Sequence, residues 1–185
     1  MKKIRFGVIG CGSIANEYHL PALRRVEGAQ LVWACDRIEE RAQKAKDDFG
    51  FEKYTLDYHD ILNDSSIDAV CIFTKIEMHA TLCIEAAAAG KHIFSQKPFA
   101  YSIEEGRKII RAVDGAGVKL TPSFMHSYMD GSIAARRIVE EGKIGEIRHI
   151  RMRNATKNPF DSAPGYGGCM MDIGCLGMDL IHTVA

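Results

Sequence analysis

The sequence lacks three features that would assign it to a specialised class of protein. It has no charge excess, because 24 lysines and arginines face 24 aspartates and glutamates, so no summed field favours nucleic acid or anionic lipid. It has no apolar run long enough to span a bilayer, and the residues after Met1 show no signal-peptide pattern. We therefore expect a cytoplasmic protein that binds a small molecule, with neither nucleic acid nor membrane as partner.

The six cysteines also lack a pattern, since no C-x-x-C pair occurs among them. They are scattered through the chain, several inside apolar runs, at positions 11, 35, 71, 83, 169 and 175. This distribution predicts reduced, mostly buried thiols and argues against a zinc or other metal site.

Short apolar runs alternate with longer amphipathic ones over the first two thirds of the chain, which is typical of a doubly wound parallel α/β sheet. Strands are expected at 4–9, 30–35, 69–73, 92–95 and 119–123. Helices are expected between them, at 14–26, 38–49, 58–62, 78–89 and 103–116. Pro21 should break or kink the first helix, and Ser102 with Glu105 predicts a capping box at the start of the last, which should end at Gly117.

A glycine turn of the form G-x-G-x-x-A follows the first expected strand. Gly10 permits a tight turn, Gly12 has no Cβ and lets a pyrophosphate approach, and Ala15 allows close packing of helix and strand. The helix start at Ser13 and Ile14 offers unpaired N–H groups to phosphates. We expect a dinucleotide at this turn, the alternative being a plain strand-to-helix connection.

Asp36 ends the second expected strand, close to where a Rossmann-type fold places the acid that binds the ribose. A carboxylate there accepts hydrogen bonds from the 2′- and 3′-hydroxyls and repels a 2′-phosphate, which favours NAD. Arg37 leaves NADP open, because a guanidinium can stack on adenine or pair with a phosphate. The alternative for Asp36 is a turn residue at the end of a strand.

Two further strand ends carry polar side chains. Thr74 and His79 follow the third expected strand, where they either reach the ribose or pyrophosphate or cap the next helix. Lys97, before Pro98, ends the fourth strand where the nicotinamide would lie. Its ammonium could stabilise negative charge that develops on a substrate oxygen, although a lysine at a strand end is more often simply solvated.

The pattern changes after about residue 123, where we expect a helix at 131–141, a strand at 146–157 and a helical segment at 170–185. One strand and two helices cannot complete a second sheet. We therefore expect a domain at 1–122 that binds the dinucleotide and a partial domain at 123–185.

These motifs in this order resemble the glucose–fructose oxidoreductase/inositol dehydrogenase family of sugar and polyol dehydrogenases. The resemblance rests on the glycine turn, Asp36, Thr74 with His79, and the strings DAV (68–70), AGKH (89–92), KP (97–98), GKIGEI (142–147), GG (167–168) and DIG (172–174). It implies a Rossmann domain followed by an open-faced-sheet domain for substrate binding and homo-oligomerisation. It also implies catalytic roles for Lys97 and Asp172, and cofactor contacts that include Gln96.

The chain departs from the family pattern at two residues and in its length. Gln96 stands where the family has glutamate, which removes a charge that could orient Lys97. Leu176 stands where the family has the histidine that acts as general base, and leucine cannot exchange a proton. The resemblance further implies several more strands, so the chain is either a fragment or a short relative.

The last helical segment places Asp172, Leu176 and Asp179 at i, i+4 and i+7, so both carboxylates are expected on one helix face. His182 is either a displaced base or, as we favour, a surface histidine near the chain end. Candidate substrate residues are His126, Asn154, Asp179 and His182.

Together these features predict an NAD(P)-dependent oxidoreductase that transfers a hydride between nicotinamide and a hydroxyl of a sugar, cyclitol or related polyol. Gln96 and Leu176 favour an alternative, a non-catalytic dinucleotide-binding sensor or regulatory protein. A third possibility is a Rossmann protein for another nucleotide.

Overall fold

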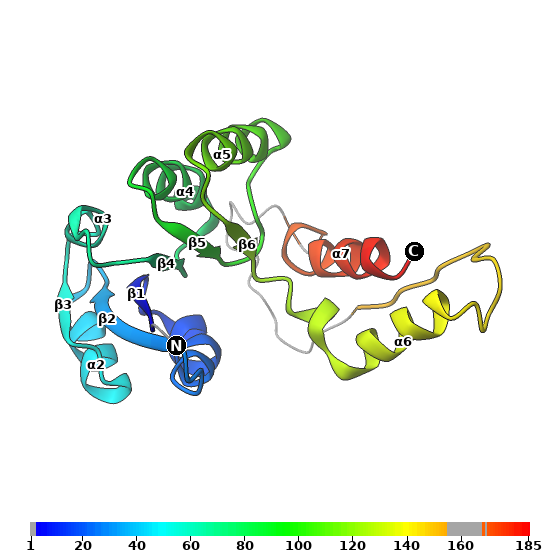
Figure 1. The fold of residues 1–185 in the computed structure, drawn as a ribbon, viewed down its shortest axis with the longest axis horizontal. Coiled ribbons are helices and arrows are strands. Elements are labelled where there is room, and N and C mark those ends of the chain that lie inside the picture. Colours follow the sequence, from blue (N-terminus) through cyan, green and yellow to red (C-terminus); the bar gives the residue numbers. More distant parts are fainter. Residues whose placement is uncertain (1–2, 155–167, 169) are drawn as a thin grey trace. The chain divides into compact units, whose positions relative to one another are not determined.

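The first of the two compact units in the chain, Met1–Pro122, is built on a six-stranded parallel sheet. The computed structural model describes residues 3–154, 168 and 170–185. The strands lie in the order β3-β2-β1-β4-β5-β6 (Figure 1). Their bounds are Ile4–Ile9 (β1), Ala29–Cys35 (β2), Lys53–Thr55 (β3), Ala69–Ile72 (β4), His92–Ser95 (β5) and Leu120–Pro122 (β6).

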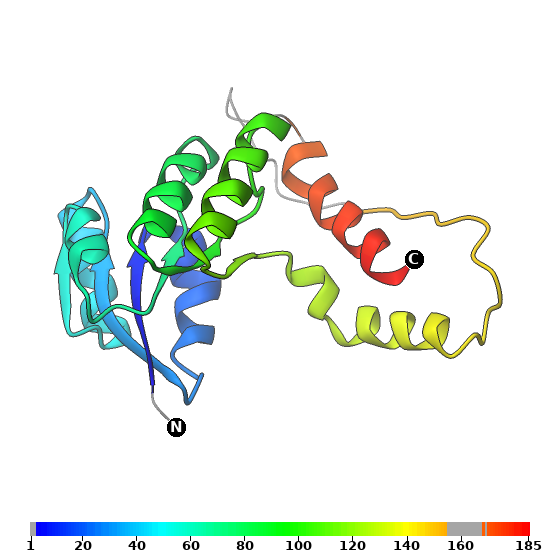
Figure 2. The same cartoon turned by 45° about the horizontal axis from the view of Figure 1, so that its top comes forward.

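Helices connect successive strands, as parallel pairing requires. They are α1 (Leu20–Leu23), α2 (Glu39–Phe49), α3 (His59–Asn63), α4 (His79–Ala88) and α5 (Ile103–Ala116). Figure 2 shows α4 and α5 side by side against the sheet. Within the described residues, no helix is both long and apolar enough to cross a membrane.

The sheet is covered on both faces, and β4 shows this most directly. Val70 and Ile72 belong to one buried cluster, which includes residues of α3, α4 and α5. Cys71 and Phe73 belong to the other, which includes residues of α1 and α2. Alternate side chains of a strand point to opposite faces, so a strand that is apolar throughout is suited to a sheet between two helical layers. The predicted doubly wound fold is confirmed.

The structure adds one strand that the sequence did not predict. The three-residue strand β3 pairs with β2 at the edge of the sheet, with Trp33 opposite Lys53. The Lys53 ammonium lies 3.9 Å from the centre of the Trp33 ring, and the indole N–H donates to Asp64 at 2.8 Å. Three residues are too few to show an alternating pattern, so tertiary contacts decide this strand.

The ends of the helices follow local rules in two places and depart from them in one. Ser102 Oγ accepts a hydrogen bond from the Glu105 N–H, and Gly117 ends α5 with a φ of +66°, as predicted. Pro21 does not break its helix, because α1 continues to Leu23. Instead a π-helical segment, Ala15–His19, precedes the proline, in keeping with a residue that has no N–H to bond back along the helix.

Five of the six cysteines lie among the described residues, and all five are free; Cys169 lies outside the described residues. Four of them are buried, as expected, and Cys175 is half-buried. Burial raises the pKa of Cys11, Cys35 and Cys71 to about 12, so these side chains remain neutral thiols at physiological pH.

The second unit, Ser123–Ala185, contains helices and irregular chain in its described part. Its elements are α6 (Asp130–Glu140) and α7 (Cys175–Val184), with a 3-10 turn at Met125–Tyr128 and a π-helical segment at Met170–Gly174. Both helices were predicted. The strand predicted at 146–157 is wrong for its described residues, 146–154, which form no ladder. A strand requires a partner, and the described part of this unit supplies none.

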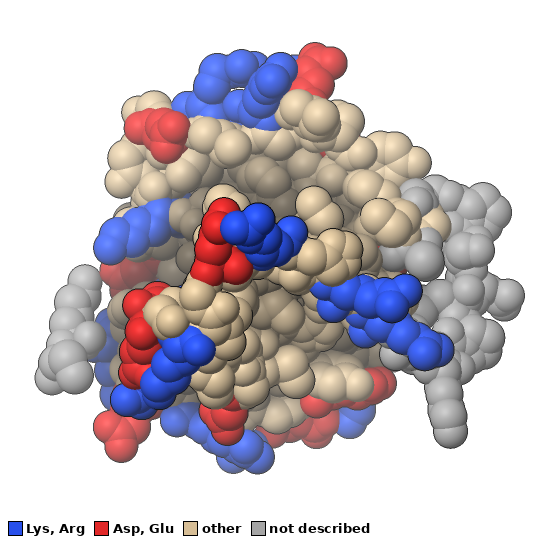
Figure 3. All heavy atoms as spheres, turned by 90° about the vertical axis from the view of Figure 1, so that its right-hand side faces the viewer, with Lys and Arg blue, Asp and Glu red and all other residues tan. Residues whose placement is uncertain are grey.

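Charged side chains of both signs are interspersed over the face drawn in Figure 3, in keeping with the zero net charge of the sequence.

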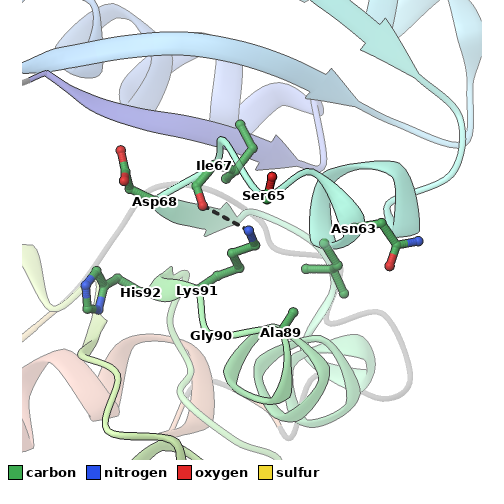
Figure 4. Close-up of a pocket in the computed structure, with 9 residues that line it drawn as sticks. Asn63, Ser65, Ile67, Asp68, Ala89, Gly90, Lys91 and His92 are labelled. Carbon is green, nitrogen blue, oxygen red and sulfur yellow. Dashed lines mark hydrogen bonds between the residues drawn. The ribbon is translucent and has the colours of Figure 1, made fainter.

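Lys91 fixes the loop that leads into β4 (Figure 4). Its side chain is buried, and the ammonium donates to the carbonyls of Asp64 at 2.7 Å and Ile67 at 3.0 Å. Burial lowers the pKa of Lys91, while Asp64 and Asp68 act in the opposite direction. The lysine thus joins two carbonyls of this loop, of which the Asp64 carbonyl also accepts the Ile67 N–H at 3.1 Å.

We predict that Lys91→Met destabilises the protein by about 1–3 kcal/mol, because the Asp64 and Ile67 carbonyls each lose a charged hydrogen-bond donor. Chemical denaturation would measure the loss. The matched control is Lys108→Met on α5, whose exposed ammonium pairs with Glu104 at 2.9 Å and whose removal should cost less than about 0.5 kcal/mol. Equal losses for the two variants would contradict the assigned role of Lys91.

Candidate functional site

The register of the sheet places the candidate cofactor residues in one row. Ile9 at the end of β1 faces Cys35 on β2 and Ile72 on β4, and Ile72 faces Ser95 on β5. The pairing extends one residue further, because Gly10, Phe73 and Gln96 donate backbone N–H bonds to Cys35, Ile9 and Ile72, each at 2.8 Å. The row lies at the carboxyl edge, where the strand order reverses around β1. Ligands of open α/β sheets bind at such a point.

Gly10 is required by the turn itself. Its φ is +97°, and a Cβ on it would lie 2.6 Å from the Phe73 carbonyl oxygen. Both the backbone angle and the contact exclude other residues.

Gly12 differs, because a Cβ there would meet no atom within 4 Å. The protein interior therefore gives no reason for a glycine at this position, whereas a ligand that approaches the backbone does. Asn16 donates from Nδ2 to the carbonyls of Cys11 at 2.6 Å and Gly12 at 2.8 Å. Because these two carbonyls accept hydrogen bonds from the helix that follows, the turn is left with backbone N–H groups to bind a phosphate. The glycine turn fits the pyrophosphate of a dinucleotide.

Asp36 connects the turn to the end of β2. One of its carboxylate oxygens accepts the Cys11 N–H and the other accepts the Ile38 N–H, each at 2.9 Å. Each oxygen has a further lone pair, so the half-buried carboxylate can also accept from hydroxyl groups of a ribose. Arg37 beside it is exposed.

Thr74 and His79 follow β4, and the structure gives them different environments. Thr74 is half-buried, and its hydroxyl donates to the Lys75 carbonyl at 3.3 Å. His79 is fully buried, with Nδ1 at 2.9 Å from the Pro98 carbonyl and Nε2 at 3.1 Å from the Thr74 carbonyl. A neutral ring donates only one of these bonds, and burial lowers the pKa of His79. The ring joins the loop after β4 to the loop after β5.

Gln96 and Lys97 follow β5, and a residue that the sequence did not single out lies against them. The Lys97 N–H donates to the Gln96 side-chain oxygen at 2.7 Å, and the Gln96 amide nitrogen lies 3.0 Å from Nε2 of His19. Gln96 is buried and Lys97 is half-buried. His19 lies 77 residues from Gln96 in the chain, and only its position four residues after Ala15 of the glycine motif could have drawn attention to it.

In the second unit, Asp172 and Leu176 are both buried. Asp179 is half-buried and accepts a short hydrogen bond from the Ser127 hydroxyl. The π-helical segment that contains Asp172 means that the uniform helical spacing assumed from the sequence does not hold from Asp172 to Asp179. Lys97 and Asp172 belong to different units, each described by itself.

The remaining candidate residues of this unit have varied surroundings. Asn154 donates to the Ile173 carbonyl at 3.4 Å and borders a cavity of about 270 Å³, lined also by methionines 152, 170 and 178. His126 is half-buried in the 3-10 turn, and His182 is exposed on α7. The cavity is mostly apolar and Asn154 is its polar group.

A larger cavity, of about 640 Å³, lies at the opposite edge of the sheet, around Lys91. Its residues lie at the end of α3, in the loop before β4, and before and at the start of β5. The Lys91 ammonium already donates to two backbone carbonyls, and Figure 4 shows its bond to Ile67. The glycine turn and Asp36 are at the carboxyl edge, so the chemistry favours that edge over the larger cavity.

Comparisons with known proteins agree with this geometry. A family model described as "Oxidoreductase family, NAD-binding Rossmann fold" matches residues 4–124, and one described as "GFO/IDH/MocA C-terminal domain" matches residues 133–185. An inositol 2-dehydrogenase from Salmonella paratyphi B is 31% identical over 165 residues, which cover 87% of this chain and 49% of the relative. The chain spans about half the length of the curated relatives it matches.

Solved structures show the same relationship. The apo scyllo-inositol dehydrogenase of Lactobacillus casei matches with a TM-score of 0.91 at 27% identity, over 100% of this chain and 55% of that one. The WlbA dehydrogenase of Bordetella pertussis, solved with NADH and UDP-GlcNAcA, matches with a TM-score of 0.71 at 32% identity, over 79% of this chain and 42% of that one. The chain belongs to the Gfo/Idh/MocA family of oxidoreductases, whose N-terminal domain is an NAD-binding Rossmann fold.

Proposed function

We propose that this chain forms the dinucleotide-binding part, and the beginning of the substrate part, of an NAD(P)-dependent oxidoreductase that acts on a hydroxyl of a cyclitol, sugar or related polyol. The observation that carries the proposal is the row at the carboxyl edge, with the open space at Gly12 beside the Asp36 carboxylate. Inositol and nucleotide-sugar dehydrogenases among the similar proteins support the substrate class.

The cofactor proposed is NAD, which supplies a nicotinamide that accepts or donates a hydride. The N–H groups of Gly12, Ser13 and Ile14 hold the pyrophosphate in this proposal, and the free lone pairs of Asp36 accept from the ribose hydroxyls. A negative charge at Asp36 disfavours a 2′-phosphate. The exposed Arg37 keeps NADP as the second choice.

Lys97 is proposed to bind the reacting oxygen of the substrate and to stabilise its developing negative charge. Its backbone is fixed by Gln96, so the ammonium extends from a defined point at the sheet edge. The buried Asp172 is proposed to position Lys97 or the substrate in the assembled enzyme. Because Leu176 cannot carry a proton, water, Lys97 or His182 must accept the proton.

Two residues favour a second candidate, a dinucleotide-binding sensor or regulatory protein without turnover. Leu176 is buried and apolar at the position where the family places its base, and Gln96 takes the place of an acid. Both candidates require the same cofactor edge.

The organisation of the whole protein is also a proposal. We propose that 1–122 binds the cofactor and that 123–185 begins the domain for substrate binding and oligomerisation, where His126, Asn154 and Asp179 contact substrate. Apolar side chains exposed on this unit, such as Met170 and Met178, support an interface in the complete protein. The free, buried cysteines support a cytoplasmic location.

The two glycines of the turn give a matched test of cofactor binding. We predict that Gly12→Ala leaves the melting temperature of the protein unchanged, because a Cβ there meets no protein atom. The same methyl group occupies the space of the pyrophosphate, so the Kd for NAD⁺ or NADH, measured by calorimetry, should rise by at least about tenfold, or ~1.4 kcal/mol.

Gly10→Ala is the control. It should lower the free energy of unfolding by more than about 1 kcal/mol, because its φ is positive and its Cβ contacts the Phe73 carbonyl. Undiminished NAD⁺ affinity in the Gly12 variant would contradict the proposed position of the pyrophosphate.

Turnover separates the two candidate functions. With NAD⁺ and a panel of inositols and sugars, an enzyme should give a substrate-dependent rise in NADH absorbance, and Lys97→Met should reduce the rate by about 100-fold or more. Lys108→Met, on the surface of α5, should retain the full rate. NADH formation that survives in the Lys97 variant would refute the role of Lys97. NAD⁺ binding without turnover of any panel member would support the sensor.

A further inference from the structure

His19 occupies a fixed position at the carboxyl edge although no role in the reaction has been assigned to it. It is the last residue of the π-helical segment, and its ring stacks on Phe73 with centroids 4.2 Å apart and planes inclined by 8°. The Phe94 ring meets it nearly edge-on at 5.7 Å and 77°. Two aromatic side chains from different strand ends thus hold the ring with Nε2 towards Gln96.

The hydrogen bonds of Gln96 determine which way its amide points. A backbone N–H can only donate, so the atom that lies 2.7 Å from the Lys97 nitrogen must be the side-chain oxygen. The amide NH₂ then lies on the other side, 3.0 Å from Nε2 of His19. A rotated amide would place NH₂ against the Lys97 N–H and lose that bond.

The amide orientation in turn determines the protonation of His19. An NH₂ group donates, so Nε2 of His19 must accept and carries no proton. The ring is therefore the neutral tautomer with its proton on Nδ1. A charged ring would set two donors against each other and break the bond to Gln96.

We propose that His19 is a positioning residue for Lys97: the neutral ring holds the Gln96 amide, which holds the Lys97 backbone, and protonation of His19 releases this chain of contacts. The inference rests on the function proposed for Lys97, and it concerns the control of that residue by its neighbours.

The surroundings of the ring agree with a neutral state. Burial lowers the pKa of His19 from its usual value. Among the described residues, ring contacts and a hydrogen bond join His19 to Phe73, Phe94 and Gln96, all of them uncharged. Protonation is therefore expected only below the ordinary histidine pKa of about 6.5.

A glutamate at position 96 would keep the hydrogen bond to the Lys97 backbone but would reverse the direction of the hydrogen bond to His19. Its carboxylate can accept the Lys97 N–H, but it offers His19 only an acceptor. His19 would then have to donate from Nε2, and the adjacent negative charge would favour the imidazolium. Gln96 is thus the residue that keeps this cluster uncharged.

The test is imidazole ¹⁵N NMR of the whole chain without cofactor, with the His19 signals assigned from a His19→Gln variant. The expected result at pH 7.5 is an unprotonated Nε2 and a protonated Nδ1. As the pH is lowered, the backbone amide signal of Lys97 should shift with the midpoint of the His19 titration. A protonated Nε2 at pH 7.5, or a Lys97 amide that ignores the His19 titration, would overturn the inference.

Gln96→Glu supplies the second measurement. The His19 midpoint should rise by about 1–3 pH units and its proton should move to Nε2. An unchanged His19 midpoint would refute the role of Gln96. If this variant fails to fold, the wild-type measurements still decide the matter. Because neither requires NAD or turnover, failure here is distinguishable from failure of the proposed enzyme activity.

Discussion

The hydrogen-bonded register around β1 fixes where every candidate residue of the first unit lies. A slip of one residue would turn each side chain to the other face, so the buried alternation of β4 strongly constrains the pairing. Gly7 contributes to this arrangement, because a Cβ on it would lie 2.3 Å from Cγ2 of Ile61 on α3. The backbone of β1 therefore meets α3 directly. With β1 in place, Gly10 and Gln96 reach the same edge through backbone bonds, and the Asp36 carboxylate accepts the Cys11 N–H there.

Much of this edge could be predicted from the sequence, because it depends on local rules. A glycine turn after an apolar run, an acid after the next strand and a lysine after a later strand each occupy a strand end, and parallel strands bring these ends together. The capping box at Ser102 and the glycine that ends α5 are equally local. The strand β3 and the role of Lys91 could not be predicted, since both depend on contacts with residues distant in the chain.

His19 and His79, the two histidines at this edge, also make contacts that the sequence could not predict. The cofactor contact of His79 stays a prediction, but its ring also lies between the carbonyls of Thr74 and Pro98, a position that the sequence did not predict. His19 drew no attention, yet it contacts Gln96. Each ring joins segments that are far apart in sequence, so spacing alone gives no signal.

In the second unit, helical periodicity predicted α7 correctly but not the π-helical segment before it, whose altered spacing changes the faces on which Asp172 and Asp179 lie.

The residues proposed to bind the cofactor all lie in the first unit. The most direct test of cofactor binding is hydrogen–deuterium exchange of the chain with and without saturating NAD⁺. Slower exchange is predicted at residues 10–14 and 36–38, on the carboxyl edge of the sheet. Slower exchange at the opposite edge instead, around 62–68 and 89–92, or no change in either place, would contradict a dinucleotide site at the glycine turn.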